Sequence, residues 1–145
     1  MDQQFILFKL AGEYYGVDIA AIESIIKMQP ITTVPQSPGS VEGVINLRGV
    51  VLPVLDLRRR FGLPRQEADK ETRIIVVETA GRAVGLVVDA VSEVLRIPPE
   101  DIEPPSVFVT TVDSAFITGI AKVAERLVTL LDLAQLLLLE EQVRM

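Results

Sequence analysis

The chain has 145 residues, of which about half (49%) are apolar, and this length and composition are typical of one globular domain. Its 14 Lys or Arg and 20 Asp or Glu residues give a net charge of −6. It contains no cysteine and no histidine, which excludes disulfides, zinc and iron–sulfur sites, cysteine nucleophiles and the commonest general base. Residues 1–68 hold seven basic and seven acidic side chains and residues 69–145 hold seven and thirteen, so no basic face for nucleic acid is expected.

The first predicted elements, in chain order, are two short strands in FILFKLAGEYYGVDI, residues 5–19. They flank a hairpin turn at Ala11-Gly12-Glu13, where glycine supplies a positive φ. Ala20–Ser24 is long enough for only a turn or two of helix, and SIIKM after it returns to strand. Two further strands are expected around Val44–Leu47 and Val50–Leu55.

The second half of the chain repeats the first. A shift of 69 residues aligns Phe5–Lys27 with Ile74–Arg96, and a shift of 76 aligns Val41–Phe61 with Ile117–Leu137. The same elements are therefore expected again. They are a helical turn at Asp89–Glu93, a strand at EVLRI, and strands around Gly119–Val123 and Leu127–Leu131.

Five short strands in each unit predict an all-β fold of two small closed barrels packed side by side, because closure removes exposed sheet edges. We expect one domain, 1–145, with subdomains of about residues 1–64 and 73–145, a polar linker at 63–72, and exchange of strands between barrels allowed. The segment LAQLLLLEEQ near the carboxy terminus predicts a helix packed between the barrels, and a partner groove is the alternative.

Positions that are alike in both units are expected to serve the fold. Asp56 and Asp132 recur before short helical patterns, where they are predicted to cap helices instead of forming a catalytic pair. Gly16 and Gly85 recur as strand glycines where the core comes close. The recurring Gly43 has two open interpretations, close packing or room for a partner.

Positions kept in one unit only are candidates for function. Arg58-Arg59-Arg60 aligns with Ala134-Gln135-Leu136; at least two of the three arginines are expected to be solvated, and a site for an acidic partner is the alternative.

The segment Asn46-Leu47-Arg48-Gly49 aligns with Lys122-Val123-Ala124-Glu125. Only Leu47 aligns with a residue of the same kind, the apolar Val123. Asn46 and Arg48 are two residues apart and are predicted to share one side of a strand, before Gly49 turns the chain. The pair would form a hydrogen-bonding patch for a carboxylate or for carbonyls of a partner helix. A purely structural arginine is the alternative.

The segment VEGVINLRGVVLPVLDLRRRFG, preceded by YYGVDIAAIESIIKMQPITTVPQSP and followed by AVGLVVDAVSEVLRIPPEDI, resembles the CheW family of chemotaxis coupling proteins. The resemblance covers essentially the whole chain and implies two five-stranded SH3-like barrels around a shared apolar core. It also implies a non-enzymatic adaptor between the cytoplasmic tip of chemoreceptors and the regulatory domain of a chemotaxis histidine kinase.

The resemblance implies receptor contacts at Ile22, on the helical turn, and at Gly43, Asn46, Arg48 and Gly49. A receptor helix tip would dock in an apolar groove between the barrels, with Arg48 near it, and the barrel ends would meet similar barrels of the kinase, at residues that the sequence does not assign. Family members often have a glutamate where this chain has Ser24. Ser24 cannot form an ion pair with Arg48, so Glu23 is the neighbouring acid that could brace it, and without that brace Arg48 is freer to contact the partner.

The sequence leaves two alternative functions. An adaptor of a related chemosensory pathway, such as one controlling type IV pili, would use the same surfaces. An enzyme or small-ligand barrel would use Asp18, Asp56, Asp89 or Asp132, but the chain has no glycine-rich phosphate loop and no nucleophile elbow.

We therefore expect no catalytic residue, cofactor or metal. The longest uncharged stretch, Met28–Val41, holds three prolines and cannot span a membrane, and the amino terminus has no basic-plus-apolar leader, so a cytoplasmic protein without membrane insertion is expected. The family resemblance implies that its partners hold it at receptor arrays.

Overall fold

The computed structural model describes residues 2–35, 41–79, 81–104 and 116–137. The strands in this part of the chain are β1 (Gln3–Leu10), β2 (Glu13–Asp18), β3 (Ile22–Lys27), β4 (Val41–Leu47), β5 (Val50–Asp56), β6 (Arg73–Thr79), β7 (Arg82–Val88), β8 (Ala90–Ile97), β9 (Ile102–Glu103), β10 (Ile117–Val123) and β11 (Arg126–Leu131). The short helices are η1 (Ile19–Ala21), α1 (Leu57–Arg60) and η2 (Pro99–Asp101), and residues 133–137 are also helical.

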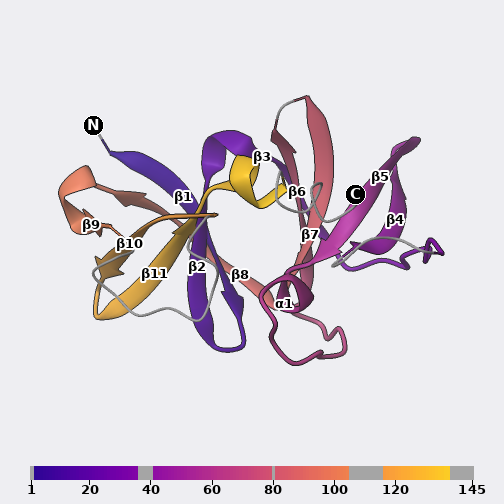
Figure 1. Ribbon diagram of the computed structural model, residues 1–145, viewed down its shortest axis with the longest axis horizontal. Coiled ribbons are helices and arrows are strands. Elements are labelled where there is room, and N and C mark those ends of the chain that lie inside the picture. Colours follow the sequence, from indigo (N-terminus) through magenta and orange to yellow (C-terminus); the bar gives the residue numbers. More distant parts are fainter. Residues whose placement is uncertain (1, 36–40, 80, 105–115, 138–145) are drawn as a thin grey trace.

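The strands form two sheets that lie side by side (Figure 1). The six-stranded sheet has the order β8-β1-β2-β11-β10-β9 and the five-stranded sheet the order β3-β6-β7-β5-β4. Each sheet combines strands of both sequence repeats, joined by parallel pairs, β2 with β11 and β5 with β7. The predicted all-β fold is confirmed, and the sixth strand is the two-residue β9.

The chain crosses between the sheets at two places that the repeat makes equivalent, from β2 to β3 and from β7 to β8. Both places were predicted to be helical turns, and both predictions are wrong in detail. A 3₁₀ turn covers only Ile19–Ala21, and no helix replaces strand β8. The reason is that β3 pairs with β6 and β8 with β1 as soon as the chain has crossed, so the ladders satisfy the backbone groups that a helix would otherwise satisfy.

The apolar core consists of three clusters. One lies within each sheet, and the largest lies between the sheets and takes side chains from both, among them Phe8, Val17, Leu86, Phe116 and Leu136. The shared core implied by the family resemblance is thereby confirmed. Leu133 and Leu136 are buried in this central cluster, as predicted for core packing, whereas residues 138–145 lie outside the described part of the chain. None of the described helices is long and apolar enough to cross a membrane.

Gly16 and Gly85, which recur in both units, occupy the same place in the two sheets. A Cβ atom on Gly16 would lie 2.9 Å from Leu130 Cδ2, and one on Gly85 would lie 2.9 Å from Ile74 Cγ2. Each glycine therefore lets a neighbouring core side chain approach the backbone. The sequence prediction of close packing is confirmed at both positions.

Candidate functional site

The segment Asn46–Gly49 forms the tip of the β4–β5 hairpin. β4 ends at Leu47 and β5 begins at Val50, so Arg48 and Gly49 are the two turn residues, with φ of 51° and 84°. Two positive φ angles are typical of the turn that matches the twist of a hairpin. The Asn46 Oδ1 atom accepts a hydrogen bond of 2.9 Å from the Gly49 N–H and holds the turn closed.

The prediction that Asn46 and Arg48 share one face of a strand is therefore wrong, because Arg48 lies in the turn, where side chains do not alternate. The equivalent residues of the second unit, Ala124 and Glu125, have φ of 46° and 69° and form the same turn. The turn itself thus serves the fold, and the difference between the units is the exposed Arg48 side chain. Among the described residues no ion pair joins Arg48 to Glu23.

Gly43 is buried and serves a contact within the chain. A Cβ atom there would lie 2.1 Å from the Thr32 carbonyl oxygen, because Thr32 and Val44 exchange two backbone hydrogen bonds of 2.9 Å. At the equivalent Gly119, a Cβ atom would lie 2.6 Å from Ile102 Cγ2 and 3.0 Å from the Glu103 carbonyl oxygen, where β9 pairs with β10. Of the two interpretations, close packing accounts for the geometry at Gly43.

Ile22 lies apart from the hairpin tip. It is the first residue of β3, half-buried, and it packs against the central core. In Figure 1, η1 and the start of β3 lie between the sheets, whereas β4 and β5 form one end of the molecule. It is the other end of β3 that approaches the hairpin, where Gln29 Nε2 donates a long hydrogen bond of 3.5 Å to the Asn46 carbonyl.

The five residues predicted as receptor contacts thus divide into a hairpin tip, with Gly43 buried behind it, and a position between the sheets. Beside Ile22, Ala21 helps to line a cavity of about 400 Å³, together with Thr79, Ile102, Leu133 and Ala134. Most of its lining comes from the six-stranded sheet, including Phe5, Thr118 and Leu130, and Thr79 of β6 borders it from the five-stranded sheet.

The position of the missing glutamate, Ser24, differs sharply from its equivalent in the other sheet. Glu93 forms an ion pair of 2.9 Å with Arg126, whose guanidinium stacks on the Tyr14 ring. The equivalents in the five-stranded sheet are Ser24, whose buried hydroxyl has no hydrogen-bond partner among the described residues, and Val50, which is 57% exposed. The polar network is therefore present at one end of the molecule and replaced by apolar surface at the other.

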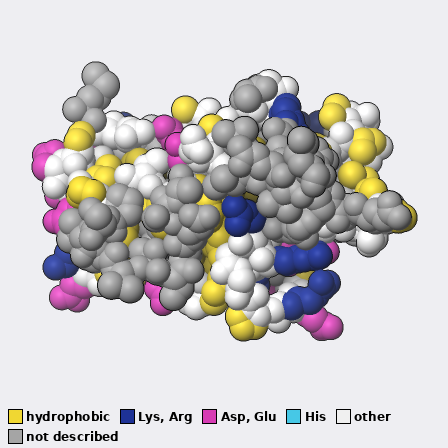
Figure 2. Space-filling model, in the orientation of Figure 1, with side chains coloured by type: hydrophobic (Ala, Val, Ile, Leu, Met, Phe, Trp, Pro, Cys, Tyr) yellow, Lys and Arg dark blue, Asp and Glu magenta, His cyan; other side chains and the backbone are white. Residues whose placement is uncertain are grey.

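Exposed apolar side chains recur at equivalent positions of the two units, which the sequence analysis missed. Ile25 and Val94 are 69 residues apart and face solvent from β3 and β8, and Val51 and Leu127 are 76 residues apart and face solvent from β5 and β11. Val51 is 63% exposed, the largest fraction of the four. In Figure 2 apolar side chains gather at the end of the molecule formed by β4 and β5. The sequence signal that could have revealed these positions is an apolar residue at the outward-facing position of the same strand in both repeat units.

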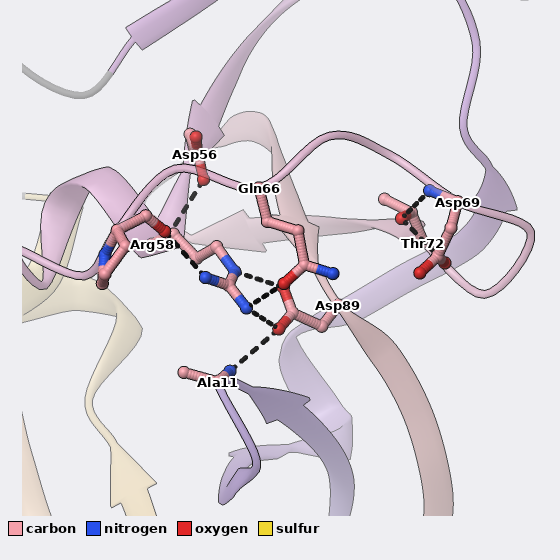
Figure 3. A network of polar contacts seen from close by, with 8 residues as sticks. Ala11, Asp56, Arg58, Gln66, Asp69, Thr72 and Asp89 are labelled. Atoms are coloured by element: carbon pink, nitrogen blue, oxygen red, sulfur yellow. Dashed lines mark hydrogen bonds and ion pairs between the residues drawn. The ribbon is translucent and has the colours of Figure 1, made fainter.

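The arginine triplet is only partly solvated, whereas at least two of its three side chains were expected to be solvated. Arg59 is exposed, Arg60 lies over the Phe116 ring, and Arg58 is buried, with a side chain that is 11% exposed. Arg58 Nε and Nη2 donate to the two carboxylate oxygens of Asp89 at 2.8 and 2.6 Å (Figure 3). Its other bonds go to the Pro64 carbonyl at 2.7 Å and to the Gln66 side chain. Sequence alone could not find this pair, because its members are 31 residues apart.

The Asp89 carboxylate is also bound by the Ala11 N–H at 2.8 Å. Partial burial raises the pKa of Asp89, but hydrogen bonds from Arg58 and Ala11, with the charge of Arg58, outweigh burial and place the pKa below its ordinary value. The hydrogen bond to Asp89 in turn raises the pKa of Arg58. We call these two residues the clasp.

The other aspartates that an enzyme would need also have structural partners. Asp56 Oδ1 accepts from the Arg58 N–H at 3.1 Å, Asp132 from the Gln135 N–H at 3.0 Å and Asp18 from the Ala20 N–H at 2.9 Å. The predicted caps at Asp56 and Asp132 are confirmed. The four candidate aspartates are thus engaged in caps and an ion pair.

Comparison with known proteins gives a consistent result. The family model described as CheW-like domain matches residues 4–141. The chain is 38% identical to the chemotaxis protein CheW of Klebsiella aerogenes, over 96% of this chain and 84% of that one, and 40% identical to that of Helicobacter pylori, over 92% and 81%. It is 34% identical to the protein FrzA of Myxococcus xanthus, over 72% and 65%. The crystal structure of the scaffolding protein TtCheW from Thermoanaerobacter tengcongensis superposes with a TM-score of 0.85 at 44% identity, covering 92% of this chain and 86% of that one.

Proposed function

The chain belongs to the CheW family of scaffold and adaptor proteins, and on that premise we propose that it is a non-enzymatic adaptor coupling chemoreceptor tips to the regulatory domain of a chemotaxis histidine kinase. The observation that carries the proposal is the hairpin tip, where exposed Arg48 stands beside Val50 and Val51. A cation next to exposed apolar side chains is typical of a protein-binding surface. The engagement of the candidate aspartates supports the absence of catalysis.

The proposed receptor surface has two parts. A receptor helix tip would place apolar side chains in the cavity that Ala21, the neighbour of Ile22, lines together with residues of the six-stranded sheet. Arg48, on its exposed turn, would bind a carboxylate or carbonyls of the same partner. Asn46 and Gly49 would act by fixing the turn, and Gly43 by allowing Thr32 to pack behind it.

The proposed kinase surfaces are the exposed apolar positions at the two ends of the molecule. Ile25 and Val51 belong to the five-stranded sheet, and Val94 and Leu127 to the six-stranded sheet. Their recurrence suits a partner that is itself built from similar barrels, because each end would meet a related surface. Through these contacts the protein would be held at receptor arrays in the cytoplasm.

A related chemosensory pathway with another output is the second candidate. The match to FrzA, which is not named as a CheW protein, favours keeping it. Both candidates use the same surfaces, so binding assays with partners from each pathway distinguish them.

Arg48→Glu is expected to weaken binding to a purified chemoreceptor tip about tenfold, a loss of about 1.4 kcal/mol, because the turn would present the opposite charge. Circular dichroism should show an unchanged fold, since Arg48 is exposed. Ala134→Trp, which fills the cavity from an exposed helical position, should weaken the same binding. Arg59→Glu is the matched control, with the same charge change on exposed α1, and should bind as wild type.

Isothermal titration separates the outcomes of this experiment. If the wild-type protein binds neither receptor tip nor kinase regulatory domain at about tens of micromolar, the adaptor function is wrong. If wild type binds but a folded Arg48→Glu protein binds equally well, only the assignment of the hairpin tip is wrong.

Val51→Glu is expected to weaken binding to the kinase regulatory domain about tenfold, because a carboxylate would be buried at an apolar contact. Val34→Glu is the control, since Val34 is also an exposed valine, 38% accessible, but lies outside the strands. Equal affinity of the Val51 and Val34 variants, measured by the same titration, would contradict the proposed kinase surface.

A further inference from the structure

The two sheets meet along two seams that the sequence repeat makes equivalent. The clasp seam contains the β1–β2 turn, the chain joint at Asp89 and helix α1. The second seam contains the equivalent end of β6, the joint at Ile19–Ala21 and the helical residues 133–137. Both seams keep the capping aspartate, Asp56 in one and Asp132 in the other.

The clasp seam is tied by one carboxylate. Ala11, in the turn of the six-stranded sheet, and Arg58, which follows β5 of the five-stranded sheet, both donate to Asp89. The Asp89 N–H in turn donates to the Lys9 carbonyl at 3.0 Å. In Figure 3 the Arg58 guanidinium faces Asp89 and Gln66 together, so the linker is joined to the same group.

Among the residues that the structure describes, the second seam has no equivalent of this ion pair. The repeat places Ala20 opposite Asp89 and Ala134 opposite Arg58, and methyl side chains can form neither ion pairs nor hydrogen bonds. Instead, Ala134 and the neighbouring Ala21 line the cavity of about 400 Å³. The two seams are thus alike in backbone architecture but differ in their side-chain contacts, an ion pair in the clasp seam and alanine side chains in the second seam.

We propose that the clasp locks one seam and acts as a hinge, so that relative movement of the two sheets changes the width of the second seam. Two charge-assisted bonds from a planar guanidinium fix both distance and orientation, and their low exposure, 11% for Arg58 and 24% for Asp89, protects them from water. Contacts between apolar side chains at the second seam are non-directional and allow sliding. This inference concerns the free protein and goes beyond the proposed function.

The absence of cysteine allows spin labels to measure each seam separately. Cysteines at Glu13 and Arg59 flank the clasp seam, and cysteines at Glu78 and Gln135 flank the second seam; all four positions are exposed. Double electron–electron resonance on the free protein should give a narrow distance distribution for the first pair and a broader one for the second. A distribution at the clasp seam as broad as that at the second seam would overturn the proposal.

Removing the clasp should change the distances measured across the clasp seam. Asp89→Asn is expected to broaden the Glu13/Arg59 distribution and move it to longer distances. Glu93→Gln is the matched control, because it breaks an ion pair with Arg126 that lies within the six-stranded sheet, and it should leave the distribution unchanged. A folded Asp89→Asn protein with the wild-type distribution, or equal broadening in the control, would show that the clasp does not lock the seam.

Arg58→Lys provides a second test if Asp89→Asn does not fold. Lysine keeps the charge but loses the planar fork that binds both carboxylate oxygens and the linker. The same broadening at the clasp seam is expected. A narrow, wild-type distribution in this variant would contradict the hinge, and the fold of each labelled protein is checked by circular dichroism.

Discussion

Replacing Gly43 with alanine should lower the free energy of unfolding by about 3 kcal/mol or more, or prevent folding altogether. The new methyl group would lie 2.1 Å from the Thr32 carbonyl oxygen, and a backbone atom cannot move aside as a flexible side chain can. The bridge between Thr32 and Val44 would have to open, which removes two hydrogen bonds of 2.9 Å. Urea unfolding followed by circular dichroism measures the effect.

Gly49→Ala is the control for this prediction. No atom lies within 4 Å of a Cβ placed on Gly49, so alanine there meets only the strain of a positive φ, about 1 kcal/mol. Equal stability of the two variants would show that Thr32 does not approach Gly43 closely. The comparison also bears on function. If Gly43→Ala is the less stable variant, a loss of partner binding in that variant reports a disrupted hairpin and not a lost contact with the partner.

Removing one member of the clasp should have the other large effect on stability. Arg58→Met should lower the free energy of unfolding by about 3 kcal/mol, because the Asp89 carboxylate, 24% exposed, would keep the Ala11 N–H as its one partner within the described part of the chain. The Pro64 carbonyl and Gln66 would also lose a donor. Arg59→Met, at the exposed neighbouring position, should change stability little. Similar losses in both variants would contradict the buried role of Arg58.

The ion pair between Arg58 and Asp89 also predicts how the difference in stability between wild type and Arg58→Met depends on pH. Because the pKa of Asp89 is lower in the folded protein than its ordinary value of about 3.9, the clasp stabilises the fold fully above that pH. Its contribution is lost as the pH falls through the folded pKa, where Asp89 binds a proton. The gap in stability between wild type and Arg58→Met should therefore shrink in acid and stay constant near neutral pH. A gap that is unchanged in strong acid would show that Asp89 is not the partner.

Local signals in the sequence predicted local structure well. The hairpin at Ala11-Gly12 is present, with φ of 51° and 81°, because the chemistry of a two-residue turn is set by the turn residues themselves. The caps at Asp56 and Asp132 were predicted for the same reason, since a cap bonds to an N–H only two or three residues away. The alternation of apolar residues likewise predicted where strands lie.

Predictions that extended a local rule past its element were wrong. Arg48 was placed on a strand by counting in twos, although the strand ends one residue earlier. At least two arginines of the triplet were expected to be solvated, yet only Arg59 is exposed, and Arg58 is buried against Asp89, which lies far along the chain. Ala20–Ser24 was taken as helical because nothing local showed that β6 would pair with Ile22. The first error concerns where a strand ends, and the other two concern a partner that is distant in sequence.

The sequence by itself determined the duplicated all-β plan, the turn and cap positions, and the difference between the hairpin tips around Arg48 and Glu125, because these depend on residues that are neighbours in the chain or equivalent in the repeat. Only the tertiary structure decided which strands share a sheet, that Gly43 makes room for Thr32, and that Ile22 lies away from the hairpin tip. It also decided that one seam is clasped and the other lined by alanines. These features arise when strands of both repeats assemble into each sheet, and that assembly is governed by the burial of a shared core.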